Sequence, residues 1–149
     1  MTYEEFLTRF REKILSYRQN GNRLYFEVRK EDIREIGRFL FGELGCRLST
    51  STATEVYDGF EVQYHFSDDR EGRYFSPLVR LSREEPEMDS LVPVTKAAAW
   101  IEREIHDLFG IVFHGHPALK PLLKEDNEGI SGHPLRQEGK EQNERPRPL

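Results

Sequence analysis

The stretch AWIEREIHDLFGIVFHGHPALKPLL, residues 99–123, is the densest part of this 149-residue chain and decides its interpretation. Thr95 can cap a helix that runs through this stretch, and Gly110 can end it after Phe109 in a left-handed conformation. The apolar residues expected along its core-facing side are Ala97, Ile101, Ile105 and Leu108. The charged residues expected mostly on its other faces are Glu102, Arg103, His106 and Asp107.

The charges of this helix admit three interpretations. A charged helix face is the ordinary one. An acid/base cluster of Glu102, Arg103, Glu104 and Asp107 is the second, because paired carboxylates can split their pKa values and carry proton chemistry. Because the charges precede the apolar segment 108–113, Arg103 flanked by carboxylates also suits a protein–protein contact, where it would set register and specificity.

Histidines gather just after the helix. His106, His114 and His116, with Glu102 and the distant His133, supply enough donors for a zinc or nickel site. Their spacing matches no recognised metal motif. We therefore favour an ordered loop in which His116, followed by Pro117, makes hydrogen bonds that fix the backbone.

Upstream, the pattern predicts a helix, a strand and a second helix. Thr2 and Glu5 have the spacing of a capping box. Apolar residues then recur at helical steps, which predicts a helix that ends near residues 20–21; they are Phe6, Phe10, Ile14 and Tyr17. Alternation over residues 24–28 predicts a strand with one buried face. A second helix is expected over residues 31–44, with Gly45 as its left-handed cap.

A meander of strands follows. Residues 47–57 and 60–66 flank Asp58 and Gly59, a hairpin signal in which both turn residues need positive φ. The residues expected to share one face are Phe60, Val62, Tyr64 and Phe66. Residues 74–81 form a third strand, placed at an edge or bulge by Pro77, and residues 82–93 are expected to be irregular. The fold class is α+β, with an antiparallel or mixed sheet of about four strands and helices packed on it.

Composition excludes several classes of protein. The net charge of −5 gives no basic field for nucleic acid or anionic lipid, and no apolar run approaches the roughly 20 residues of a spanning helix. The first residues lack the charge order of a signal peptide, so a cytoplasmic location is expected. The lone Cys46 cannot form a disulfide or hold an iron–sulfur cluster, and is expected to be a small buried filler. Residues 1–123 are expected to fold as one domain, and the charged residues 124–149 as an extended tail that gains order on a partner.

The densest stretch closely resembles the signature of the thirty-kilodalton subunit of respiratory complex I, and of the related subunits of membrane-bound energy-converting NiFe hydrogenases. The matching residues, which include a downstream second element, are Trp100, Glu102, Arg103, Glu104, Asp107, Leu108, Phe109, Gly110, Ile111, Phe113, Gly115, His116, Pro117, Leu119, Gly132, His133, Pro134, Leu135 and Arg136. Departures from the complex I pattern at Ala118, at Lys120 and Pro121, and at residues 137–139 leave the branch open between NADH dehydrogenase and hydrogenase.

The resemblance implies a non-catalytic subunit with no flavin, cluster or quinone chemistry of its own. It implies docking on a large subunit that holds the quinone site or the NiFe centre, near the small subunit that bears iron–sulfur clusters, on the cytoplasmic side of the cell membrane. Its part would be positional, because it holds these subunits in register for electron transfer and ion pumping. The matching residues above, apart from Leu108 and Ile111, are then the candidate partner-interface residues. Two alternatives remain: a small metal-dependent enzyme built on the histidines, and a generic soluble adaptor.

Overall fold

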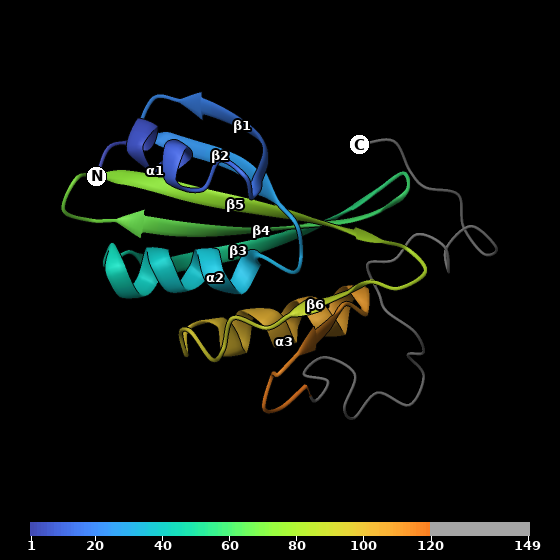
Figure 1. The fold of residues 1–149 in the computed structure, drawn as a ribbon. Coiled ribbons are helices and arrows are strands. Elements are labelled where there is room, and N and C mark those ends of the chain that lie inside the picture. The colour runs from blue at the N-terminus through green and yellow to red at the C-terminus, as the bar shows by residue number, and fades with distance from the viewer. Residues whose placement is uncertain (120–149) are drawn as a thin grey trace, which may run out of the picture.

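A five-stranded sheet in the order β1-β2-β5-β4-β3 forms the centre of the computed structural model, which describes residues 1–119 (Figure 1). The elements in chain order are α1 (Tyr3–Arg9), β1 (Ile14–Asn20), β2 (Arg23–Val28), α2 (Ile33–Arg38), the π-helical turn η1 (Phe39–Glu43), β3 (Arg47–Val56), β4 (Gly59–Asp68), β5 (Arg73–Ser82), β6 (Glu87–Asp89), α3 (Ala98–Phe109) and β7 (Val112–His114). Within the five-stranded sheet, the strand pairs are antiparallel except β2 with β5, which is parallel. The α+β class with a mixed sheet is confirmed. The tail 124–149 and the second signature element lie outside the described residues.

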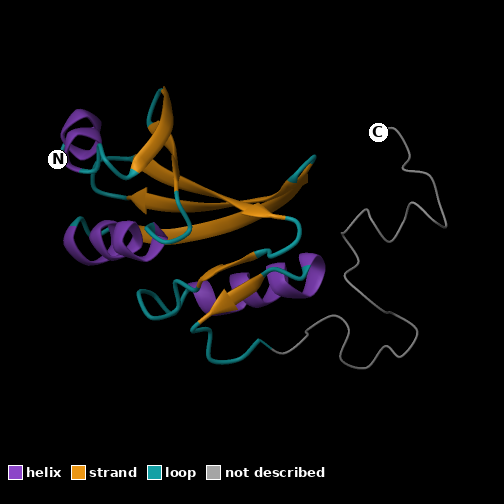
Figure 2. Ribbon diagram, turned by 45° about the vertical axis from the view of Figure 1, so that its right-hand side comes forward, coloured by secondary structure: helices purple, strands orange, loops and turns teal. Residues whose placement is uncertain are grey.

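The core lies on one face of the sheet, which the helices cover (Figure 2). Phe6 of α1 contacts Phe26 and Phe75 of the sheet at ring-centroid distances of 5.1 and 5.0 Å, and Phe109 of α3 contacts Phe60 at 6.0 Å. The predicted alternation is confirmed for β2 and β4, whose core-facing side chains are buried; these are Leu24, Phe26, Val28, Phe60, Val62, Tyr64 and Phe66. The opposite face of the sheet carries mainly polar side chains.

The predicted long N-terminal helix is wrong beyond Arg9. The capping box is present, because the Thr2 hydroxyl accepts from the Glu5 amide at 3.0 Å and the Glu5 carboxylate accepts from the Thr2 amide at 2.8 Å. The helix ends after Arg9, however, and residues 14–20 form edge strand β1. Gly21, with φ of 62°, starts a two-residue turn that folds β1 back on β2. Hairpin pairing therefore overrides the helical spacing of apolar residues.

The predicted hairpin between β3 and β4 is confirmed, but its turn is displaced by one residue. Val56 pairs with Gly59, so the turn residues are Tyr57 and Asp58, and neither has positive φ. Gly59 is needed for another reason. A Cβ atom there would lie 1.9 Å from the carbonyl oxygen of Leu81 on β5, so only glycine allows the two strands to approach this closely.

Two expectations about β5 and the segment after it are wrong. Pro77 lies neither at an edge nor at a bulge, since β5 runs between β2 and β4 and keeps one register with each of them. Pro77 stands opposite Phe26 in β2, and the residue pairs between β4 and β5 skip Ser76 and Pro77, where proline offers no amide hydrogen. The segment 82–93 is not wholly irregular either, because β6 pairs in parallel with β7 in a small second sheet.

The helix expected over residues 31–44 is largely confirmed. α2 begins at Ile33 and continues into η1, and Gly45 follows with φ of 76°, as predicted for a left-handed cap. Cys46 is buried, also as predicted. Within residues 1–119, no helix is long and apolar enough to span a bilayer.

Candidate functional site

The signature helix α3 turns a different face to the core from the one expected. Four of its buried residues form one stripe at helical spacing, namely Ala98, Glu102, Ile105 and Phe109. Asp107, beside this stripe, is buried too. Of the residues predicted for the core face, only Ile105 is buried. The helix ends at Gly110 with φ of 79°, as predicted. Its N-cap is Ala97, not Thr95, although the Thr95 hydroxyl accepts from the Ala97 amide at 3.3 Å.

Glu102 is the centre of a buried polar cluster. Its side chain is completely buried, contrary to the expected exposed face. One carboxyl oxygen accepts from the Tyr64 hydroxyl at 2.7 Å and from the Leu91 amide at 2.9 Å, and the other accepts from the Ser90 hydroxyl at 2.5 Å. Since a buried carboxyl is costly unless it is hydrogen-bonded, these donors explain how the helix tolerates it. Glu102 thereby ties α3 to β4 and to the segment that follows β6.

Burial sets the protonation of this cluster. It raises the pKa of Glu102 above its ordinary value, against the opposing effect of the hydrogen bonds from Leu91, Ser90 and Tyr64. Burial, together with the nearby Glu102 charge, raises the pKa of Tyr64 well above its usual range, so Tyr64 stays a donor. Because Glu102 has no exposed surface, it cannot reach a substrate in this conformation. The acid/base interpretation of the charged helix therefore has no support at Glu102.

The side chains of His106 and His116 contact backbone groups, whereas that of His114 lies 3.5 Å from the Glu87 carboxylate. His116 accepts from the Ala118 amide through Nδ1 at 3.0 Å, so its Nε2 carries the hydrogen and donates to the Ala99 carbonyl oxygen at 2.8 Å. His106 Nδ1 lies 2.9 Å from the Ile111 carbonyl oxygen. The predicted role of His116 in fixing the loop is confirmed. In residues 1–119, no group of three or more metal-ligating side chains could hold a metal ion.

A residue that the sequence did not single out supports the same region. Arg34 of α2 donates to the Ser90 carbonyl oxygen at 3.1 and 2.9 Å, and to the His114 carbonyl oxygen at 3.1 Å. It thus joins the ends of β6 and β7 to the main domain. A Cβ atom at Gly115, where φ is 87°, would lie 3.0 Å from the same guanidinium, so this turn is built around Arg34.

The remaining signature residues are divided between interior and surface. Asp107, Phe109 and Phe113 are buried within the chain. Trp100 is 62% exposed, and the Arg103 guanidinium lies 5.8 Å from the centre of its ring. The Arg103 Nε atom is buried and has no hydrogen-bond partner among the described residues. Glu104, Gly115 and Pro117 are exposed, and Leu119 is partly buried.

The fold and this helix-centred cluster define a class of protein that has solved members. The trypsin-resistant fragment of Nqo5 matches with a TM-score of 0.70 and 26% identity, covering 80% of this chain and all of the fragment. The chain belongs to the family of the 30-kilodalton subunit of respiratory-chain NADH dehydrogenase, whose model matches residues 26–145. The resemblance noted in the sequence is thereby confirmed.

Individual relatives agree with this assignment. The chain is 35% identical over 136 residues to the NADH-quinone oxidoreductase subunit designated C from a Ruegeria species, covering 85% of this chain and 65% of that protein. It is 33% identical over 140 residues to the Geobacter metallireducens counterpart, covering 87% and 82%. An archaeal membrane-bound sulfane sulfur reductase complex shares the fold, with a TM-score of 0.68, 23% identity and coverage of 89% and 78%. The chain spans less than two thirds of the length of the Ruegeria relative.

Proposed function

We propose that this chain is a non-catalytic structural subunit in the hydrophilic arm of a membrane-bound, ion-pumping oxidoreductase of the complex I type. It binds the large subunit that holds a quinone site or a NiFe centre, next to the small subunit with iron–sulfur clusters. It carries no cofactor of its own, and any flavin, quinone, cluster or NiFe centre belongs to the partners. It lies on the cytoplasmic side of the membrane and attaches there only through the complex.

The observation that carries this proposal is the exposed Trp100 beside the half-buried Arg103 on α3. Tryptophan and arginine are the residues most enriched where binding energy concentrates in protein interfaces. Trp100 is largely exposed although it lies within the family signature, and the adjacent Arg103 has a buried donor without an acceptor among the described residues. A partner that covers Trp100 would bury its ring and could supply that acceptor.

Burial excludes some of the signature residues from the proposed contact with a partner. Glu102, Phe109 and Phe113 are enclosed by the chain itself, so their side chains serve the fold. The proposed interface therefore consists of Trp100, Arg103 and Glu104 on α3, with Pro117 and Leu119 of the following loop. The tail, including Gly132, His133, Pro134, Leu135 and Arg136, extends this contact across the partner in our proposal.

The test is purification of the tagged chain from gently solubilised membranes of its own host, with co-purifying subunits identified by mass spectrometry. Flavin- and quinone-associated subunits would assign it to an NADH dehydrogenase, and a large subunit with a NiFe centre to a hydrogenase. Recovery of the chain alone would contradict the proposal and favour an adaptor. Recovery alone with stoichiometric zinc or nickel would favour the metal-dependent enzyme.

Single variants then test the interface. Trp100→Ala and Arg103→Ala should each lower the yield of intact complex while leaving the isolated chain folded. Phe41→Ala is the matched control, because Phe41 is also exposed, at 42%, but lies on η1. Unchanged yield for both α3 variants would count strongly against this interface.

A further inference from the structure

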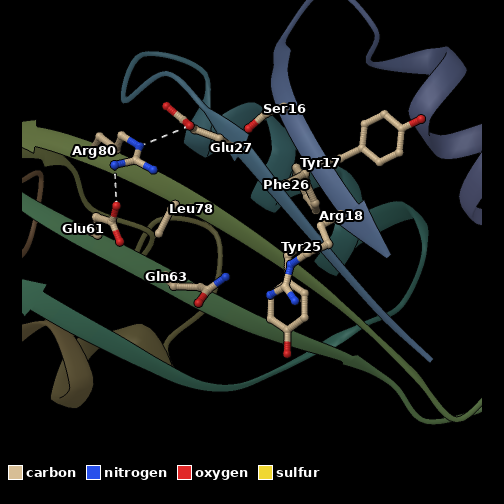
Figure 3. A pocket seen from close by; sticks show the side chains of 10 residues that line it. All are labelled: Ser16, Tyr17, Arg18, Tyr25, Phe26, Glu27, Glu61, Gln63, Leu78 and Arg80. Carbon is tan, nitrogen blue, oxygen red and sulfur yellow. Dashed lines mark hydrogen bonds and ion pairs between the residues drawn. The ribbon is translucent and has the colours of Figure 1, made fainter. Parts of the chain in front are cut away.

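The face of the sheet opposite the helices is uncovered by any described element and is hollowed. An open hollow of about 350 Å³ is lined by residues of four strands (Figure 3). Tyr25 and Glu27 of β2 stand on this face because Leu24, Phe26 and Val28 point to the core. Pairing in register places Arg18 of β1 opposite Tyr25 on the same face.

On one half of this face, the arginine is paired with carboxylates. Arg80 of β5 reaches Glu27 at 3.2 Å and Glu61 at 2.5 Å, so its charge is shared between carboxylates on both neighbouring strands (Figure 3). Such a charge has little to offer to a further anion. Arg80 carries one positive charge and its two partners carry two negative charges, so this half of the face is a slightly acidic border with a formal net charge of −1.

The other half is positive. The Arg18 guanidinium lies 4.7 Å from the ring centre of Tyr25, and the Arg23 guanidinium lies 4.5 Å from that of Tyr74. Neither arginine takes part in an ion pair within residues 1–119. The pKa of His65 on the same face is lowered by burial and, next, by the Arg23 charge, which agrees with a positive charge that no carboxylate offsets.

We propose that Arg18 and Arg23, stacked on Tyr25 and Tyr74, form a docking surface for an acidic segment of a partner subunit. Stacking fixes each guanidinium plane and leaves its N–H edge free for bidentate contact with a carboxylate. Arginine and tyrosine are also characteristic of protein interfaces. This inference rests on the proposed function, since it needs a partner subunit.

The register specifies the spacing of the acidic groups. Arg18 stands opposite Tyr25, and Arg23 is two residues from Tyr25 on the same strand, so the arginines are diagonal neighbours. Diagonal neighbours in a sheet lie roughly 7–8 Å apart. Alternate residues of an extended chain are separated by roughly 7 Å. The partner segment is therefore extended, with two carboxylates separated by one residue.

Charge reversal in the assembled complex tests this surface. Arg18→Glu with Arg23→Glu should reduce co-purifying partner subunits about tenfold or more, because it replaces attraction with repulsion. The matched control is Arg11→Glu with Arg38→Glu, which changes the net charge equally and involves exposed arginines outside this face. Thermal melting of each isolated chain separates loss of docking from loss of fold, and Arg18→Gln with Arg23→Gln serves if the reversal unfolds the chain. Equal recovery of both double variants, with the wild-type complex intact, would overturn the docking surface and leave the proposed function standing.

Photo-cross-linking supplies the second measurement on the whole complex. Replacing Tyr25 with p-benzoylphenylalanine should cross-link a partner peptide that contains two acidic residues separated by one. Tyr57 replaced in the same way is the control, because Tyr57 is fully exposed in the turn between β3 and β4 and does not line the hollow. A cross-link from position 25 to lipid, to nucleic acid or to a peptide without that acidic pair would overturn the inference, as would no cross-link. Recovery of the wild-type chain without any partner would overturn the proposed function itself.

Discussion

The hydroxyl of Tyr64 donates to the carboxyl of Glu102 across 2.7 Å, and both side chains are completely buried. The bond joins the middle of β4 to α3, although Tyr64 and Glu102 are 38 residues apart in the chain. Ser90 and Leu91 complete the cluster from the segment after β6. The signature helix is thus attached to the sheet through a buried polar contact.

Replacing Glu102 with leucine should destabilise the fold severely. The substitution keeps a side chain of similar size but leaves the Tyr64 hydroxyl, the Ser90 hydroxyl and the Leu91 amide without their acceptor. Each buried orphan donor costs about 1–3 kcal/mol, so a loss of at least about 3 kcal/mol in the free energy of unfolding is expected from urea titration. Glu104→Leu is the control on the exposed face and should change stability by no more than about 0.5 kcal/mol. Equal stability of the two variants would contradict a structural role for the buried carboxyl.

Titration of the Glu102 carboxyl should lower the stability of the fold as pH rises. Burial raises its pKa in the folded chain above the ordinary value of 4.5, so the folded state holds its proton to higher pH than the unfolded state does. Stability from this group is therefore complete below pH 4.5 and is lost as pH rises through the raised pKa. Glu102→Gln removes that titration. The difference in unfolding free energy between wild type and Glu102→Gln should accordingly shrink as pH is raised from about 4.5. A difference that grows with pH would show that hydrogen bonding outweighs burial.

Glu102 also shows where sequence patterns succeed and where they fail. Choosing apolar residues for the core face of α3 selects Ala97, Ile101, Ile105 and Leu108, which rotates the helix away from its true orientation. The stripe Ala98, Glu102, Ile105 and Phe109 has equally good spacing, but it contains a charge that periodicity alone rejects. Hydrogen-bond donors distant in the sequence, Tyr64, Ser90 and Leu91, allow the carboxyl to be buried. Ser90 and Leu91 lie in a segment that is expected from the sequence to be irregular. The alternating patterns of β2 and β4 needed no such information, so they were predicted correctly.

The N-terminal error has a different physical cause. Ile14 and Tyr17 are separated by a helical step, but pairing with β2 decides the strand conformation of residues 14–20. Gly21 followed by Asn22 between two strand-like runs was the available hairpin signal. The role of Arg34 had no signal in the sequence, because it depends on backbone carbonyl groups that only the folded chain brings together.

Cys46 should resist thiol reagents in the folded chain. Burial, above all, raises the pKa of its thiol to about 12. At pH 8 the fraction of thiolate is then roughly 10³-fold lower than for an ordinary cysteine with a pKa of about 8.5. Labelling with a chromogenic disulfide should be correspondingly slow, and should become rapid in denaturant. Ser49→Cys adds an exposed thiol on neighbouring strand β3 and should label quickly in the same folded chain. Rapid labelling of the wild-type chain without denaturant would contradict the burial of Cys46.

Gly42 and Gly59 lie before and after β3 in the chain, and replacing each with alanine should change the free energy of unfolding in opposite directions. Gly59→Ala would place a Cβ atom 1.9 Å from the Leu81 carbonyl oxygen, and because that oxygen belongs to the backbone of the adjacent strand, β4 and β5 must separate. A loss of about 3 kcal/mol or more in unfolding free energy is expected, beyond the usual cost of overpacking a side chain. Gly42→Ala, on η1, meets no atom within 4 Å and should stabilise the chain by about 0.5–1 kcal/mol by restricting the unfolded state. Chemical denaturation of both variants measures the contrast. A Gly59→Ala variant as stable as wild type would mean that the close approach of β4 and β5 is not required by the fold.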